Sequence, residues 1–132
     1  MSDNVTYQFL HDQLQQAAYA LVDDEEQKQR THLCIARLML QHTPTSEQEN
    51  ILMPMVLQYN AGRVLICDDE EQARLCQLNL KAAQQIKSSA AYETALAYAK
   101  IAKTLLAEDS WQTDYALSFA VFKEFTDCTY LC

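Results

Sequence analysis

Residues 89–107 read SAAYETALAYAKIAKTLLA, and this stretch decides the fold class. Alanines recur along it at intervals of three or four residues, which places them on one face of an α-helix. They are Ala91, Ala95, Ala99 and Ala102. Small side chains at this spacing let the backbones of two helices approach closely. The stretch therefore predicts a helix that packs tightly against another helix.

The composition of the whole chain also favours helices. Its 132 residues are 49 % hydrophobic, which suits one domain with a modest core. Gly62 is the only glycine, and Pro44 and Pro54 are the only prolines. A β-sandwich or an α/β fold needs glycines at tight turns and where backbones approach closely. We therefore expect an all-α fold of about six helices in antiparallel hairpins.

The apolar periodicity predicts where the helices lie. We expect them over residues 6–21, 23–41, 47–61, 68–87, 89–107 and 113–132. In the third helix, Ser46 with Glu49 has the spacing of a capping box, and Pro54 either kinks the helix or marks its true start. Gly62 fits the end of this helix, with an irregular helical turn after it. The packing face of the last helix is expected to be aromatic: Tyr115, Phe119, Phe122, Phe125 and Tyr130.

An acidic motif, DDEEQ, occurs twice, at residues 23–27 and 68–72. It has two interpretations: a site for a cation or a basic partner, or a helix start whose carboxylates cap free N–H groups and offset the helix dipole. A calcium loop needs alternating oxygen ligands and a central glycine, which the motif lacks. Helix capping is the favoured interpretation.

The charge and the cysteine usage exclude several classes of protein. A net charge of -8 with ten scattered basic residues disfavours binding to nucleic acid or to an anionic membrane. No apolar stretch is long enough to span a bilayer, and the first residues do not resemble a signal peptide. The five cysteines lack CxxC spacing and are expected to be small buried side chains in a reduced cytoplasm: Cys34, Cys67, Cys76, Cys128 and Cys132.

The fourth and fifth predicted helices fit the spacing of a tetratricopeptide repeat, a helix–turn–helix unit that stacks into a right-handed superhelix. With Ala95 opening the contact face, small or apolar residues fall at the other expected positions, and a further repeat begins after Trp111. These positions are Ala83, Ile86, Ala90, Ala99 and Ala102. The signature Trp, Gly, Tyr and Pro of the repeat are missing, so an unrelated helical bundle is the alternative.

The sequence offers no residues in a pattern typical of catalysis. A phosphate-binding loop needs glycines that the chain lacks. The histidines His11, His32 and His42 are far apart, and Cys128 with Cys132 makes a poor zinc site without other ligands. We expect neither catalytic nor metal-binding residues in this chain.

Several motifs resemble one family in the same order. They are FLHDQLQQAAYAL at residues 9–21, HLCIARLML at 32–40, LNLKAA at 78–83, SAAY at 89–92 and LLAEDSW at 105–111. Together they resemble the helical region that follows the AAA-type predicted ATPase in large bacterial multi-domain serine/threonine kinases and sensor histidine kinases. The chain departs from the family at Ala36 and Ala107, where glycine is typical, and at Gln13, where arginine is usual.

The resemblance implies that residues 1–62 close the upstream ATPase module and that residues 63–132 form the repeat region, within one continuous helical unit. It implies ATP in the parent protein, no cofactor in this chain, and a nucleotide-sensing role for His11 there. The ending at Cys132 without a polar tail is expected of an excised piece.

Three functions follow from these observations. The leading one is a non-catalytic, cytoplasmic scaffold that contacts other domains of the same polypeptide, with Ala83, Ala90, Ala95, Ala99, Ala102 and Trp111 as its packing residues. The second is part of the nucleotide switch of the ATPase module through His11. The third is a stand-alone repeat module that binds peptides.

Overall fold

A computed structural model describes residues 8–14, 16, 25–107 and 109–132, and every regular element in these residues is helical. Residues 8–14 are helical as well. The prediction of an all-α fold is confirmed. The elements are α2 (Glu25–His42), the 3-10 helix η1 (Thr45–Ile51), α3 (Leu52–Ala61), the 3-10 helix η2 (Arg63–Leu65), α4 (Asp69–Ser88), α5 (Tyr92–Leu105), α6 (Ser110–Thr113) and α7 (Tyr115–Leu131).

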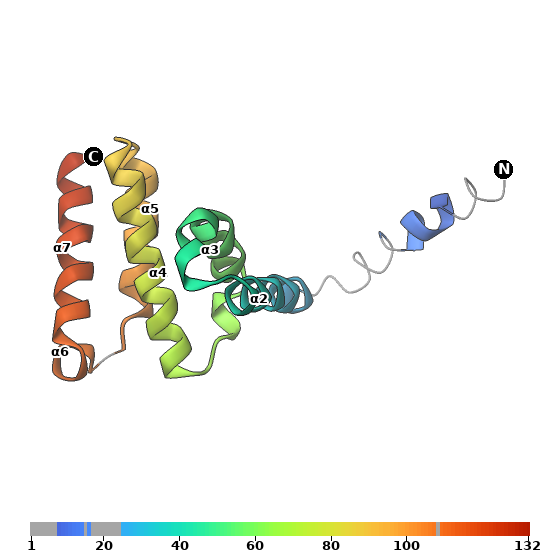
Figure 1. The fold of residues 1–132 in the computed structure, drawn as a ribbon, viewed down its shortest axis with the longest axis horizontal. Helices are drawn as coiled ribbons and strands as arrows, with labels where there is room; N and C mark the ends of the chain where they lie inside the picture. The colour runs from blue at the N-terminus through green and yellow to red at the C-terminus, as the bar shows by residue number, and fades with distance from the viewer. Residues whose placement is uncertain (1–7, 15, 17–24, 108) are drawn as a thin grey trace.

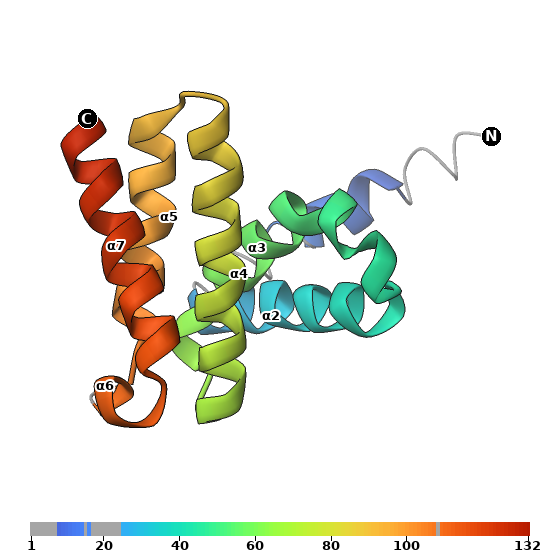
Figure 2. The ribbon, with the colours of Figure 1, turned by 60° about the vertical axis from the view of Figure 1, so that its left-hand side comes forward.

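Helices α4, α5 and α7 lie side by side and run in alternating directions (Figure 1, Figure 2). Helix α5 packs mainly on α4, and α7 packs on both. Helices α2 and α3 form a second pair that reaches α4 through α3, and α2 runs across α4 and not alongside it (Figure 2). A hairpin of α4 and α5 is therefore present, whereas tetratricopeptide-like stacking of the whole chain stays a prediction.

The second acidic motif caps a helix, as expected. The carboxylate of Asp68 accepts a hydrogen bond from the backbone N–H of Glu71 at 3.3 Å, and three acidic residues occupy the first turn of α4. Asp114 caps α7 in the same way, through the N–H of Leu117 at 3.1 Å. In the first motif, Glu25 and Glu26 lie in the first turn of α2, while residues 23 and 24 lie outside the described residues. Negative charge at these ends offsets the helix dipole.

Two predicted helix starts are wrong. Residues 45–51 form a 3-10 helix, so the α-helix begins at Leu52. Pro54 falls in its first turn, where its missing N–H breaks no helical bond, so of its two interpretations the one that marks the helix start is confirmed. The capping box of Ser46 and Glu49 is not formed. Pro44, and not Ser46, occupies the N-cap position of η1, and no side chain caps this helix.

The start of the fifth predicted helix also differs, because Ala90 lies in a turn. Helix α5 begins at Tyr92, and Ala90 has a φ of 65°, in the left-handed region. Its N–H bonds to the carbonyl of Lys87 at 2.9 Å and ends α4. This conformation costs an alanine about 1 kcal/mol. Ala90 is exposed, so it is not the packing residue that the repeat register predicted.

One apolar core connects the two helix pairs. Met55, Val56 and Tyr59 of α3 meet Leu75 of α4, and Ala99 of α5 belongs to the same cluster. A smaller cluster fills the space among α4, α5 and α7: Cys76, Leu80, Ala102 and Val121. The main cluster joins residues on both sides of the boundary expected near residue 62, and that boundary stays a prediction.

A buried amide pair lies between α3 and α4. Asn60 donates to Asn79 at 2.8 Å, and Asn79 donates back at 2.9 Å and to the carbonyl of Leu75 at 3.0 Å. Both side chains are buried, and an unpaired amide there would cost about 1–3 kcal/mol. The pair therefore favours one alignment of α3 along α4.

Helix α7 is turned relative to its predicted orientation. Tyr115, Phe119 and Tyr130 are exposed, and Phe122 and Phe125 are half-buried. The buried side chains are instead Ser118, Val121, Glu124 and Cys128. Glu124 is paired with Lys87 of α4 at 2.9 Å, which satisfies a carboxylate that is almost fully buried. Most of the predicted aromatic packing face is therefore wrong.

Gly62 is required by a close approach and not by a left-handed backbone. Its φ is -108°, which any residue adopts. A Cβ atom at this position would lie 2.5 Å from the carbonyl oxygen of Gln29 and 2.8 Å from Cβ of Leu33, both on α2. The absence of a side chain lets the end of α3 touch α2.

We predict that Gly62→Ala lowers the free energy of unfolding by about 1–3 kcal/mol, because α2 must shift away from the added methyl group. Chemical denaturation followed by circular dichroism measures this. The control is Ala61→Ser at the exposed neighbouring position, expected to change stability by less than about 0.5 kcal/mol. Equal stability of Gly62→Ala and the wild type would contradict the close approach.

Candidate interaction site

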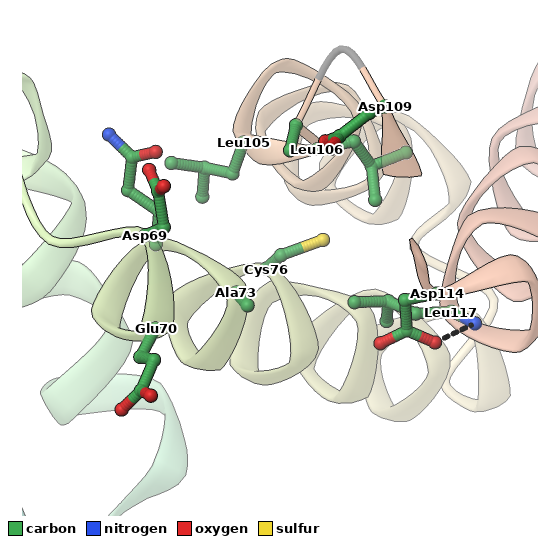
Figure 3. Close-up of a pocket in the computed structure, with 11 residues that line it drawn as sticks. Asp69, Glu70, Ala73, Cys76, Leu105, Leu106, Asp109, Asp114 and Leu117 are labelled. Carbon is green, nitrogen blue, oxygen red and sulfur yellow. Dashed lines mark hydrogen bonds between the residues drawn. The ribbon is translucent and has the colours of Figure 1, made fainter. Parts of the chain in front are cut away.

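A hollow of about 320 Å³ opens at the amino end of α4 (Figure 3). Its walls come from α4, from the connection between α5 and α6, and from the start of α7. We call it the acidic hollow, because four carboxylates line it: Asp69, Glu70, Asp109 and Asp114. Its other lining residues are Gln72, Ala73, Cys76, Leu105, Leu106, Ala107 and Leu117.

Cys76 is the thiol among the described residues that line the acidic hollow. The thiol of Cys76 is fully buried and donates to the carbonyl of Ala102 at 3.2 Å. Burial raises the pKa of Cys76 to about 12, and the carboxylate of Asp114 adds to this effect. The thiol is therefore protonated near neutral pH, and a thiol is a poor nucleophile. Among the described residues that line the hollow none is Lys, Arg or His, so carboxylates set its charge.

Aromatic rings gather on the outer side of α6 and α7. We call Trp111, Tyr115, Phe119 and Phe122 the aromatic face. The Trp111 ring lies 5.5 Å from Tyr115 and 5.3 Å from Phe122, and Tyr115 stacks 6.2 Å from Phe119, centroid to centroid. Trp111, Tyr115 and Phe119 are exposed. Exposed apolar groups that form one cluster are typical of a contact surface, whereas scattered ones are ordinary.

The side chains of Arg37, Tyr59 and Glu71 join three helices, and we call them the Glu71 joint. Arg37 of α2 donates two hydrogen bonds to the Glu71 carboxylate of α4, at 2.8 and 2.7 Å. Tyr59 of α3 donates its hydroxyl to the same carboxylate at 3.0 Å. The two-pronged geometry between guanidinium and carboxylate is the strongest common form of ion pair.

The contacts within the Glu71 joint change the pKa values of Glu71 and Tyr59. The hydrogen bond from Arg37 holds the pKa of the Glu71 carboxyl below its ordinary value, and the bond from Tyr59 acts in the same direction, while burial opposes both. Burial raises the pKa of Tyr59 to about 12, and its bond to Glu71 adds to this. Near neutral pH Glu71 is therefore ionised and Tyr59 is neutral, and these are the forms that make the hydrogen bond between them.

The residues predicted to matter for packing lie in different environments. Ala83, Ala95, Ala99 and Ala102 are fully buried. Trp111 is exposed and belongs to the aromatic face. Sequence reasoning missed the Glu71 joint and the acidic hollow, since the residues of each come from distant parts of the chain.

His11 lies in the helical residues 8–14, and its side chain is exposed. Its role in nucleotide sensing stays a prediction. Across the residues described, no group of three or more His, Cys, Asp or Glu side chains could hold a metal ion. None of the described helices combines the length and hydrophobicity needed to cross a membrane.

The chain is similar to a segment of a known signalling protein. It is 28 % identical over 143 aligned positions to hybrid signal transduction histidine kinase G from Dictyostelium discoideum. The match covers 91 % of this chain and 4 % of that kinase, so the chain spans only a small part of its relative's length. No family model and no solved structure matches the chain. The similarity supports a signal-transduction kinase context, and the bacterial setting of the resembled family stays a prediction.

We predict that Glu71→Gln destabilises the protein by about 1–3 kcal/mol at neutral pH, because the ion pair with Arg37 is lost. The folded-state pKa of Glu71 is lowered, so its contribution is complete above the ordinary value of 4.5 and is lost as pH falls below it. The free energy of unfolding of Glu71→Gln should therefore fall less steeply in acid than that of the wild type.

Denaturation at a series of pH values tests this prediction. Glu26→Gln is the matched control, because Glu26 forms an exposed pair with Arg30 within α2. Such pairs contribute little, so this variant should follow the wild-type pH profile. Identical profiles for Glu71→Gln and Glu26→Gln would contradict the importance of the Glu71 joint.

Proposed function

We propose that the chain is a non-catalytic helical scaffold in a multi-domain signal-transduction kinase, linking its ATPase module to downstream sensor and kinase domains. The family resemblance of the sequence supports this proposal, and so does the similarity to a segment of a hybrid histidine kinase. In this proposal ATP binds to other parts of the parent protein, which works in the cytoplasm.

The observation that carries the proposal is the aromatic face. Helix α7 packs on both α4 and α5, and its outer side carries exposed rings where another helix of a repeat array would pack. Each unit of such an array depends on its neighbours to bury its apolar faces. The proposed occupant of the aromatic face is a helical element of the same polypeptide.

The Glu71 joint suits a scaffold that transmits movement. Arg37 and Glu71 connect α2 to α4 across the boundary between the two helix pairs, and Tyr59 adds α3. A shift of α2 would have to break or rearrange the two hydrogen bonds from Arg37 to Glu71. Helix shifts at such interfaces are a common way to couple domains.

A second candidate function is a peptide-binding module, and the acidic hollow favours it. Its lining combines four carboxylates with the apolar side chains of Leu105, Leu106 and Leu117. This chemistry suits a peptide with a basic side chain next to an apolar one. A nucleotide-sensing role for His11 is a further alternative. If His11→Ala in the full-length protein left nucleotide affinity unchanged, that alternative would fail.

We predict that the purified chain unfolds in one cooperative transition and shows neither ATP turnover nor phosphate transfer. A coupled ATPase assay and autophosphorylation with labelled ATP measure the two activities. Turnover that co-purifies with the chain and disappears on unfolding would overturn the proposal that it is non-catalytic.

We predict that α7 is covered in the full-length protein. Amide hydrogen exchange in α7 should be at least about tenfold slower there than in the isolated chain, because covering the aromatic face suppresses local opening. Phe119→Asp should restore fast exchange in the full-length protein. Leu57→Asp is the control, since Leu57 is an exposed apolar residue of α3 away from the aromatic face. Equal exchange of α7 in both proteins would show that nothing covers it.

A further inference from the structure

A second hollow, with a volume of about 560 Å³, runs along α2 beside the Glu71 joint, and we call it the α2 groove. Leu65 and Cys67, which follow α3, contribute to its lining. Its other described lining residues recur at helical spacing along one face of α2: Glu26, Arg30, Leu33, Cys34, Arg37 and Leu38. The groove therefore follows α2 for about 18 Å, at the rise of an α-helix.

The shape and the chemistry of the α2 groove suit an apolar helix. A groove that follows one helix face for about three turns can receive a second helix laid alongside it. Arg30 is paired with Glu26, and Arg37 is held by the Glu71 joint. These charges are already balanced, so the groove favours an apolar occupant over an ionic one. The apolar side chains that line it are Leu33, Leu38 and Leu65.

An exposed apolar helix face precedes α2 in the chain. Residues 8–14 are helical, and we call them the N-terminal helix. This helix lies apart from α2 in Figure 1, and Phe9, Leu10 and Leu14 on it are exposed. Leu10 and Leu14 are one helical turn apart and Phe9 adjoins Leu10, so the three lie on one side. The apolar pattern of the sequence continues beyond the N-terminal helix, at residues that lie outside the described ones: Ala17, Ala18 and Leu21.

We propose that the N-terminal helix docks in the α2 groove of its own chain and runs antiparallel to α2. Docking covers exposed apolar side chains of both helices, namely Phe9, Leu10 and Leu14 of the N-terminal helix and Leu38 of α2. Removal of this apolar surface from water favours the docked arrangement. The proposal concerns contacts within this chain, so it does not depend on whether the chain acts as a scaffold.

The length of the connection sets the direction of the docked helix. Residues 22–24 separate the apolar pattern of the sequence from the first residue of α2. Helices joined by so few residues pack as antiparallel neighbours. Both helices rise by the same amount per residue, so residues equally distant from the connection face each other. In this register Leu14 lies opposite Leu33 and Cys34, and Leu10 lies near the far end of the groove.

The N-terminal helix and the α2 groove belong to one polypeptide, and this favours an occupant from the same chain. A segment on a short tether reaches an effective concentration of about a millimolar, which a separate partner has to exceed. The tether is residues 15–24, and a chain of this length extends to roughly 33 Å. This reach exceeds the length of the groove, so the N-terminal helix can lie along all of it.

The thiol of Cys34 reports on docking, because it lines the α2 groove and is exposed when the N-terminal helix lies apart. Labelling of the native chain with N-ethylmaleimide, followed by mass spectrometry of its peptides, measures the accessibility of each thiol. We expect Cys34 to react at least about tenfold more slowly in the wild type than in Leu14→Asp, because a charge in the contact undocks the helix. Cys132 is exposed outside the groove and should react equally fast in both.

Gln8→Asp is the matched control, since Gln8 bonds to Asp12 on the polar side of the N-terminal helix. It adds the same charge away from the contact and should keep the slow wild-type labelling of Cys34. Cys76 and Cys128 are fully buried, and their protection in each variant shows that the fold is intact. Equal labelling of Cys34 in the wild type and in Leu14→Asp would overturn the proposal. Labelling that slows as the protein concentration rises would also overturn it, because the occupant would then be another chain.

Discussion

The carboxylate of Glu71 is the point at which the two helix pairs are held together. It lies in the first turn of α4 and accepts hydrogen bonds from Arg37 of α2 and Tyr59 of α3. Since it is largely buried, removal of its partners would leave a charge that costs several kcal/mol. Helix α2 runs across α4, so its position depends on this contact and on its packing against α3 (Figure 2).

Close approach is the second constraint, and small residues make it possible. Gly62 lets the end of α3 touch α2, and Ala95, Ala99 and Ala102 let α5 lie against its neighbours. The buried face of helix α7 carries Ser118, Val121 and Cys128 together with the paired Glu124, and most of the bulky rings remain outside. The aromatic face is thus a by-product of how α7 packs.

The surfaces that remain after packing differ in chemistry. The acidic hollow presents carboxylates and leucines, and the aromatic face presents rings. Both suit contacts with other protein segments. This division of surfaces fits a scaffold within a larger signalling protein, the context that the similarity to a histidine kinase supports.

The sequence by itself determined the fold class and most of the helices, but not where each helix begins. The spacing of alanines at 91–102, the single glycine and the acidic helix starts depend on contacts within one helix or one turn, so they can be recognised locally. The capping role of Asp68 and the irregular turn after Gly62 follow from such local signals.

Only the tertiary structure decided which faces meet. Helix α7 carries apolar residues on two sides, and periodicity cannot choose between them, because the choice depends on the width of the gap beside α4 and α5. The same holds for Glu71. Its place in the first turn of α4 can be recognised from the local sequence, but its partners lie on other helices and cannot. It holds as well for the cysteines: Cys34, Cys67 and Cys132 are exposed, so the expectation of buried side chains is wrong for these three. Contacts between distant segments arise from packing of the whole chain, and local patterns do not encode them.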